Sequence, residues 1–145
     1  EFLDRELSRA HRHERPLALA MFDIDRFKGI NDGHGHLAGD TALRELARLL
    51  RAVVRKDELL ARYGGEEFAM VLPETTGDQA VQACERLRAA VEAHRFVYAD
   101  TILPVTVSVG VAVSTPDTET PEQLIKAADT KLYEAKTTGR NRVAF

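Results

Sequence analysis

The sequence has a single cysteine, Cys84, and this rules out a disulfide within the chain. A lone cysteine in an apolar helical pattern is typical of a protein from a reducing compartment. The sequence also lacks any apolar run near the ~18 residues that a transmembrane helix needs, and it has no signal peptide. We therefore expect a cytoplasmic protein without direct membrane contact. A membrane tether of the full-length protein would lie in N-terminal segments outside this sequence.

Neither sign of charge is in large excess, because 20 Lys and Arg residues oppose 23 Asp and Glu residues for a net charge of −3. Such a chain has no general electrostatic field for nucleic acid or a membrane surface, so any phosphate binding has to be local. Its 145 residues, 44% of them apolar, are enough for one globular domain spanning residues 1–145. Because the first residues already follow a helical pattern, we expect this domain to belong to a longer protein.

Two apolar, strand-like runs, residues 59–63 and 68–72, lie on either side of a short glycine-containing segment. Gly64 and Gly65 predict a two-residue hairpin with a type I′ turn, in which both central residues have positive φ. Glu66 and Glu67 follow directly. Neighbouring carboxylates repel each other unless a positive group neutralises them. Either a divalent cation binds here, or the pair only keeps the hairpin tip soluble.

The run from Leu17 to Ile24 is apolar apart from Asp23, which is typical of a strand that is covered on both faces. A carboxylate in such a strand is costly unless it is paired or bound to a metal, so Asp23 is a candidate metal ligand. Asp25, two positions further on, is more simply explained as a turn or cap residue.

Residues 26–40 are polar and glycine-rich, and we expect them to form a loop between this strand and the next helix. Such a loop can present backbone N–H groups to a phosphate. Local alternatives stay open for its polar residues: Asp40 as a helix N-cap, Asn31 as a turn residue, and His34 and His36 as solvent-exposed side chains.

The rest of the chain predicts two capped helices, a long strand and a short final strand. Thr76 and Thr120 each begin a Thr-x-x-Gln capping box. Val105 to Val113 alternates valine with small residues, which predicts a strand with one bulky and one small face. Lys136 and Arg140 near the end of the last helix are explained, on local grounds, by the helix dipole.

The chain therefore alternates helices with strands around one central hairpin. This order predicts an α+β fold, a ferredoxin-like layer sandwich in which helices flank a central, mostly antiparallel sheet. In that arrangement the strand ending at Asp23 can lie beside the hairpin and bring Asp23 close to Glu66. Carboxylates that converge near a phosphate-binding loop are typical of Mg²⁺-assisted phosphoryl or nucleotidyl transfer.

Four segments of the chain carry a resemblance to a known family. They are Phe22-Asp23-Ile24-Asp25-Arg26-Phe27-Lys28-x-Ile30-Asn31-Asp32, Gly35-His36-x-x-Gly39-Asp40, Arg62-Tyr63-Gly64-Gly65-Glu66-Glu67-Phe68 and Lys136-x-x-Gly139-Arg140-Asn141-Arg142. In order and spacing they resemble the GGDEF family of bacterial diguanylate cyclases, with a Gly-Gly-Glu-Glu-Phe variant of the motif. The resemblance implies a fold related to the polymerase palm and to nucleotidyl cyclases. It also implies a signalling reaction that joins two GTP molecules into cyclic di-GMP and releases two pyrophosphates.

The resemblance further implies roles for individual residues. Asp23, Glu66 and the backbone carbonyl of Ile24 would hold Mg²⁺ or Mn²⁺, and Glu67 would lie near a second ion. Glu66 would also accept a proton, and Lys28 would neutralise charge that grows on the phosphates. The implied substrate-binding residues are Phe27 through its backbone N–H, Asn31, His36 and Asp40 at the guanine end, and Lys136 and Arg140 at the phosphates. Because each half-site holds one GTP, the chemistry implies a homodimer, at least a transient one.

The chain departs from the family pattern at two places. The family stretch that precedes the first helix is absent, so we expect the sequence to lack part of an N-terminal segment and a sensor or receiver domain. The family's Arg-x-x-Asp product-inhibition motif corresponds to Arg55 to Glu58, where Glu58 replaces the Asp. This change predicts weak or absent product inhibition, unless these residues are simply a solvated run of charges.

An active diguanylate cyclase is the function that we expect. The alternative is a catalytically inactive GGDEF domain that binds GTP or cyclic di-GMP only to regulate a neighbouring domain. Such domains usually have a damaged motif or damaged metal ligands, whereas the residues of this chain are intact. A cyclase acting on ATP would need guanine contacts other than Asn31 and Asp40.

Overall fold

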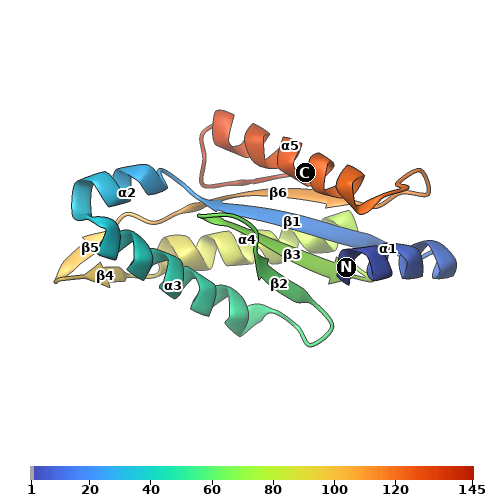
Figure 1. Ribbon diagram of the computed structural model, residues 1–145, viewed down its shortest axis with the longest axis horizontal. Coiled ribbons are helices and arrows are strands. Elements are labelled where there is room, and N and C mark those ends of the chain that lie inside the picture. Colours follow the sequence, from blue (N-terminus) through green and yellow to red (C-terminus); the bar gives the residue numbers. More distant parts are fainter. Residues whose placement is uncertain (1) are drawn as a thin grey trace.

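The computed structural model describes residues 2–145 (Figure 1). In chain order its helices and strands are α1 (Phe2–His13), β1 (Leu17–Ile24), α2 (Phe27–His34), α3 (His36–Val53), β2 (Leu59–Arg62), β3 (Glu67–Pro73), α4 (Gly77–Ala93), β4 (Phe96–Tyr98), β5 (Thr101–Leu103), β6 (Val107–Val113), α5 (Pro121–Thr137) and β7 (Val143–Ala144). The capping boxes predicted at Thr76 and Thr120 both form, each with the Gln side chain bonded back to the backbone N–H of the Thr.

A five-stranded sheet with the order β2-β3-β1-β6-β7 forms the centre of the fold. β1 pairs antiparallel with β3 on one side and with β6 on the other, β2 pairs antiparallel with β3, and only the short β7 runs parallel to its neighbour β6. β4 and β5 make a separate two-stranded hairpin. The predicted α+β fold with a mostly antiparallel sheet is therefore confirmed.

β1 separates two hydrophobic cores because both of its faces are covered. Ala18, Ala20 and Phe22 point into a core shared with α3 and α4. Leu19 and Met21 point to the opposite face, into a core shared with α1 and α5. Figure 1 shows α5 along one face of the sheet and α3 along the other. Since side chains alternate along a strand, Asp23 falls on the α5 face, and this placement decides its partner in the site.

β6 has the two unlike faces that its sequence predicts. Its valines enter the core beneath α3 and α4, while Gly110 lies directly against α5. A Cβ atom added at Gly110 would lie 2.2 Å from the backbone oxygen of Ala128 and 2.2 Å from the backbone nitrogen of Leu132. Because this face of β6 has only small residues, α5 packs closely against the sheet. The C-terminal end of α5 therefore lies over the end of β1.

The loop predicted for residues 26–40 is largely helical, which corrects the interpretation from sequence. α2 occupies residues 27–34, and α3 begins at His36 after Gly35, whose φ of 96° marks the junction. Ile30 is buried in the core and Phe27 packs against it. Because this burial outweighs the low helix propensity of the glycines, a polar, glycine-rich segment still folds as a helix.

The turn predicted at Gly64 and Gly65 is also wrong in type. Among the described residues the glycines with positive φ are Gly35 and Gly139, so the dipeptide does not form a type I′ turn. β2 and β3 are instead joined by four residues, and the N–H groups of Tyr63 and Gly64 both donate to the carbonyl of Glu67, at 2.8 and 3.3 Å. The β4–β5 hairpin was not predicted.

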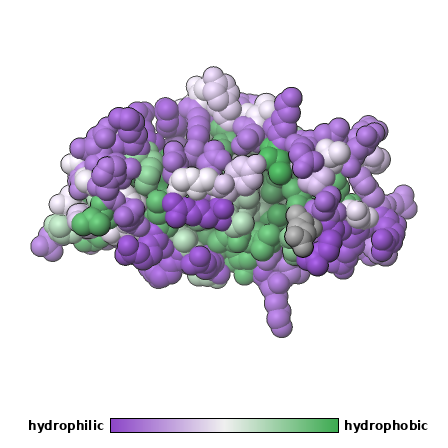
Figure 2. Space-filling view, in the orientation of Figure 1, coloured by the Kyte–Doolittle hydropathy of each residue, from purple (hydrophilic) through white to green (hydrophobic). Residues whose placement is uncertain are grey.

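The outer surface is mostly hydrophilic on the face shown in Figure 2, with apolar residues visible toward its middle. Within residues 2–145, none of the helices combines the length and the apolar character that crossing a membrane requires. Cys84 is a free thiol inside the core, and burial raises its pKa to about 12, so it is unreactive in the folded protein.

Candidate active site

The strand and the hairpin segment that carry the predicted carboxylates lie side by side at the end of β1. Asp23 is directly opposite Glu67 in the antiparallel pairing of β1 with β3. One residue further, the N–H of Ile24 donates to the carbonyl of Glu66 at 3.4 Å. The hairpin therefore places Glu66 and Glu67 beside the end of the central strand, as the sequence predicts.

Lys136 supplies the positive charge that this cluster needs in the described structure. Its Nζ donates to the carboxylate of Asp23, a residue that is 4% exposed as a whole. Burial raises the pKa of Asp23 above its ordinary value, the hydrogen bond and charge of Lys136 oppose that rise, and the negative charge of Glu66 adds to it. The resemblance assigned Lys136 to a substrate phosphate, whereas here the same ammonium group neutralises a buried carboxylate.

The donor atoms at this place suit a hard divalent cation. Carboxylates from Asp23, Glu66 and Glu67 and a backbone carbonyl at Ile24 are oxygen ligands of the type that Mg²⁺ prefers. Burial, followed by the negative charges of Asp129 and Asp23, raises the pKa of Glu67, which is the expected effect where acidic groups gather. Across residues 2–145, no three His, Cys, Asp or Glu side chains are already grouped closely enough to hold a metal. These oxygen donors are therefore chemically suited to a divalent cation. In the described structure, Lys136 neutralises the charge of Asp23.

The residues predicted to bind guanine lie on α2 and α3. The Oδ1 atom of Asn31 is buried without a hydrogen-bond partner, and it points at Gly39, where an added Cβ atom would lie only 1.8 Å away. Asp40 follows Gly39 on α3 and is exposed, while the N-cap of this helix is Gly35, so Asp40 is not a cap. A buried unpaired amide oxygen is costly unless a ligand satisfies it, so this pair of helices has the character of a binding site.

The other predicted substrate residues lie on α2, at the start of α3 and in the turn after α5. His36 is exposed at the start of α3, and Phe27 begins α2. Lys28 is exposed and its Nζ bonds Asp32 on the same helix at 2.7 Å. Arg140 follows α5 in a left-handed conformation with φ of 62°, and its N–H donates to the carbonyl of Ala135 at 2.9 Å.

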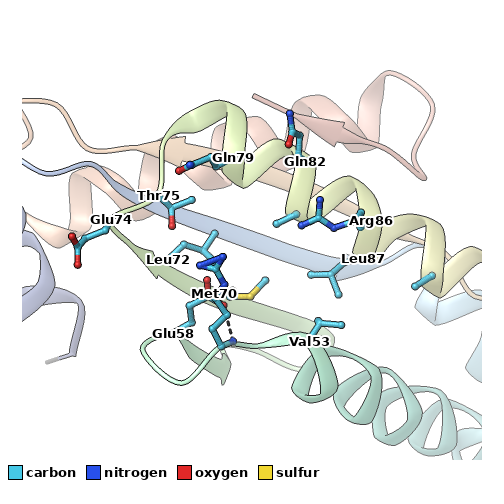
Figure 3. Close-up of a pocket in the computed structure, with 13 residues that line it drawn as sticks. Val53, Glu58, Met70, Leu72, Glu74, Thr75, Gln79, Gln82, Arg86 and Leu87 are labelled. Carbon is cyan, nitrogen blue, oxygen red and sulfur yellow. Dashed lines mark hydrogen bonds between the residues drawn. The ribbon is translucent and has the colours of Figure 1, made fainter.

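A cavity of about 410 Å³ lies next to the residues of the predicted inhibitory site (Figure 3). Arg55 and Glu58 contribute to its wall, and Glu58 Oε1 accepts a hydrogen bond from the backbone N–H of Arg55 at 2.8 Å. Arg86 on α4 reaches the same cavity, with Leu72 and Leu87 among its apolar residues. Sequence reasoning missed Arg86, because the helix pattern does not tell which polar side chain of α4 faces another element.

Asp25 is not the turn or cap residue that the sequence favoured. It is 5% exposed, and its carboxylate accepts hydrogen bonds from Thr106 Oγ1 at 2.7 Å, Ser108 Oγ at 2.6 Å and the backbone N–H of Asn141 at 2.9 Å. These partners lie far away in the sequence, so no local pattern could have found them.

Comparison with known proteins identifies the family to which these features belong. The family model described as "Diguanylate cyclase, GGDEF domain" matches residues 1–142 of this chain. Diguanylate cyclase A of Treponema denticola is 42% identical over 129 residues, which is 89% of this chain and 35% of that protein. The chain thus spans about a third of the length of that relative.

Solved structures agree with this match. The GGDEF domain of DgcB from Caulobacter crescentus, in complex with c-di-GMP, is 36% identical with a TM-score of 0.92, over 98% of this chain and 84% of that one. The active GGEEF domain of a diguanylate cyclase from Vibrio cholerae is 33% identical with a TM-score of 0.90, over 98% of this chain and 90% of that one. The name of the Vibrio cholerae domain gives its motif as GGEEF, and this chain has the same Gly-Gly-Glu-Glu-Phe sequence at residues 64–68.

Proposed function

The chain belongs to the GGDEF family of diguanylate cyclases, and from this premise we propose that it is an active cyclase that joins two GTP molecules into cyclic di-GMP. The observation that carries the proposal is the buried carboxylate of Asp23 beside the hairpin with Glu66 and Glu67. We further propose that residues 1–145 are one catalytic domain of a longer signalling protein.

Asp23, Glu66 and the carbonyl of Ile24 would hold a divalent cation, Mg²⁺ or Mn²⁺, with Glu67 near a second ion. Such an ion, when bound, lowers the pKa of the attacking 3′-hydroxyl and stabilises charge on the α-phosphate. Glu66 accepts the proton of that hydroxyl. Glu66 is half-buried at the end of the hairpin, where it is both close to Asp23 and open to a ligand.

The chain's own cations orient the phosphates. The first N–H groups of α2, near Phe27, lie just beyond the end of β1 and can donate to a phosphate tail. Lys28 is exposed beside them, and its only partner in the described structure is Asp32, in an exposed pair that is easily exchanged for a phosphate. Lys136, at the end of α5, and Arg140, in the turn that follows α5, would bind the phosphates from that side of the sheet. Lys136 now bonds Asp23, and its ammonium group would be available to the substrate phosphates if Asp23 held a divalent cation instead.

Asn31 and Asp40 would read the guanine edge, with His36 beside them. Guanine offers N1–H and N2–H₂ donors to a carboxylate and its N3 acceptor to an amide N–H. The unpaired Oδ1 of Asn31 is an acceptor that such a base can satisfy. A site built in this way leaves its polar groups unpaired with adenine, so it discriminates against ATP.

The cavity with Arg55, Glu58 and Arg86 is the proposed product site. Two arginines can offer planar donor pairs to guanine edges and phosphates. Glu58, however, stands where the family has Asp, and its carboxylate is already bonded to the backbone of Arg55. For this reason we propose that product inhibition is weak or absent.

Incubation with GTP and Mg²⁺, followed by chromatography for cyclic di-GMP, tests the proposed function. An active cyclase forms cyclic di-GMP and pyrophosphate in a ratio of one to two. The alternative, a domain that only binds GTP or cyclic di-GMP to regulate a neighbour, predicts saturable nucleotide binding without product. Binding of a non-hydrolysable GTP analogue, measured on the same sample, separates that alternative from a misfolded protein.

A further inference from the structure

The turn that follows α5 has an unusual backbone. Gly139, Arg140 and Asn141 have φ values of 133°, 62° and 46°, so three consecutive residues have positive φ. Side-chain-bearing residues rarely adopt this conformation, and it persists only where surrounding contacts hold it. Arg140, the residue proposed to contact the phosphates, lies in the middle of this strained turn.

Asp25 holds the backbone of the turn. Its Oδ2 accepts from the backbone N–H of Asn141 at 2.9 Å and from Thr106 at 2.7 Å, while its Oδ1 accepts from Ser108 at 2.6 Å. A buried carboxylate with donors on both oxygens has a fixed position. Asp25 follows Asp23 by two residues, so the same stretch of chain that carries the proposed metal ligand also anchors the phosphate-binding turn.

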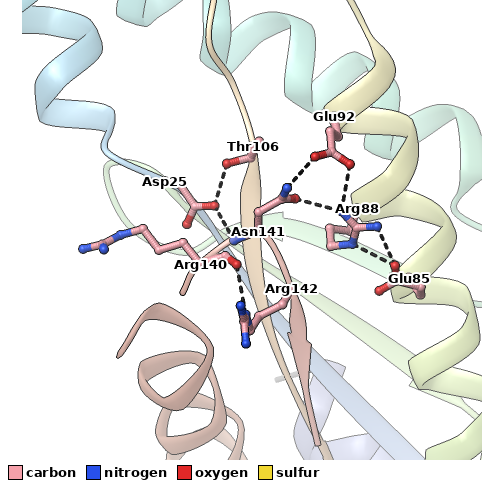
Figure 4. Close-up of polar contacts among 8 residues, drawn as sticks. All are labelled: Asp25, Glu85, Arg88, Glu92, Thr106, Arg140, Asn141 and Arg142. Atoms are coloured by element: carbon pink, nitrogen blue, oxygen red, sulfur yellow. Dashed lines mark hydrogen bonds and ion pairs between the residues drawn. The ribbon is translucent and has the colours of Figure 1, made fainter. Parts of the chain in front are cut away.

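The side chain of Asn141 is held separately, by α4 (Figure 4). Its Oδ1 accepts from Arg88 Nη1 at 2.8 Å, and its Nδ2 donates to Glu92 Oε2 at 2.6 Å. Arg88 is itself fixed, because it also bonds Glu85 through Nε and Nη2 at 2.9 and 2.6 Å and Glu92 at 3.2 Å. Only 15% of the Arg88 side chain is exposed. Figure 4 shows the side chain of Arg140 extending away from this group of residues.

We propose that Asp25, Asn141 and Arg88 are positioning residues, which hold Arg140 in its left-handed conformation so that its guanidinium meets the substrate phosphates. This inference rests on the proposed function only in assigning Arg140 to the phosphates. Asp25 and Arg88 act through Asn141, whose backbone and side chain they hold from opposite sides. Without them the turn can relax to negative φ, and the guanidinium moves away from its site.

Two variants weaken this group of contacts without removing a metal ligand. Arg88→Ala removes the bond to Asn141 Oδ1. Asn141→Gly keeps the preference for positive φ but removes the side chain, so it isolates the contact with α4. Arg48→Ala is a matched control, because Arg48 bonds Glu45 three residues earlier, at 2.9 and 3.3 Å, as Arg88 bonds Glu85, but on the surface of α3.

Binding of a non-hydrolysable GTP analogue and of guanosine is measured for each variant, together with the melting temperature. We expect Arg88→Ala and Asn141→Gly to weaken binding of the analogue about tenfold, since small displacements of a binding group have large effects. Guanosine, which has no phosphate, should bind as it does to the unmodified protein. The double variant Arg88→Ala with Arg140→Ala should bind the analogue no more weakly than Arg140→Ala alone.

Equal weakening of analogue and guanosine, or additive losses in the double variant, would overturn the proposal, because both indicate a general structural role. Unchanged analogue binding in Arg140→Ala would overturn it as well. A failure of the proposed function alone would give another result: the unmodified protein would bind the analogue through Arg140 but form no cyclic di-GMP. The positioning role of Asp25, Asn141 and Arg88 would then still stand.

Discussion

Lys136 on α5 forms an ion pair with Asp23 at the end of β1, although the two residues are 113 positions apart. The pair joins the last helix to the central strand at the place where the hairpin delivers Glu66 and Glu67. The Asp23 side chain is 5% exposed and that of Lys136 is 32% exposed, so the carboxylate has little contact with solvent. One lysine thus stabilises a carboxylate that would otherwise be buried without a partner.

Replacing Lys136 with Met keeps the length of the side chain and removes its charge. Breaking a buried pair costs about 3–5 kcal/mol, and because Lys136 is a third exposed we expect the free energy of unfolding to fall by about 1–3 kcal/mol. Urea denaturation in the presence of a chelator measures this. Lys131→Met on the same helix is the control, since its pair with Glu134 is exposed. Equal losses in the two variants would show that the Asp23 pair has no special importance.

Glu66→Gln preserves the shape of the side chain and removes both a metal ligand and a proton acceptor. We expect the rate of cyclic di-GMP formation to fall at least ~10²-fold with Mg²⁺. Glu134→Gln, an exposed carboxylate on α5, should keep the activity of the unmodified protein. Retained activity in Glu66→Gln would remove Glu66 from the mechanism.

Asp40→Asn separates recognition of guanine from helix stability. Asp40 is exposed and does not cap α3, so we expect the melting temperature of this variant to change little. GTP binding should weaken by about tenfold, because a buried base edge then loses its partner at a cost of about 1–3 kcal/mol. Nucleotide titration and thermal melting, with Asp117→Asn in an exposed loop as control, check both parts. Unchanged GTP affinity would mean that Asp40 does not contact the base.

The central strand was predictable from sequence because both of its faces are buried, and a short uninterrupted apolar run is typical of a strand covered in this way. The same reasoning located Asp23 and its approach to Glu66, since a strand and a tight hairpin can pair in few ways. The capping boxes at Thr76 and Thr120 were predictable because their hydrogen bonds are local.

The features that were missed are turn conformations and contacts between residues distant in the sequence. The sequence predicts a type I′ turn at Gly64 and Gly65, but neither glycine has positive φ. Two neighbouring residues with positive φ occur instead at Ala99 and Asp100, between β4 and β5, with φ of 49° and 64°. The helix α2 forms in spite of its glycines because Ile30 is buried. Asp25 resembles a turn residue until β6 and the segment after α5 supply its donors.

Glu58→Asp tests the proposed product site. The present carboxylate is bonded to the backbone N–H of Arg55, and the shorter Asp restores the family's geometry. We expect cyclic di-GMP to bind at least about fivefold more tightly to Glu58→Asp, in line with about 1–3 kcal/mol for a correctly placed buried hydrogen bond. Calorimetric titration measures the change, with Asp57→Asn as control. Submicromolar binding to the unmodified protein, lost on Arg55→Ala, would show that Glu58 serves as well as Asp.

We propose that two protomers, each holding one GTP molecule, together form the active site. The most direct measurement is the rate of cyclic di-GMP formation per protomer, at saturating GTP and Mg²⁺, from nanomolar to tens of micromolar protein. If two half-sites meet by weak encounter, turnover per protomer rises with protein concentration until pairing saturates. Turnover that is measurable but flat across this range, in a protein shown to be monomeric at its lower end, would contradict an active site shared between two protomers.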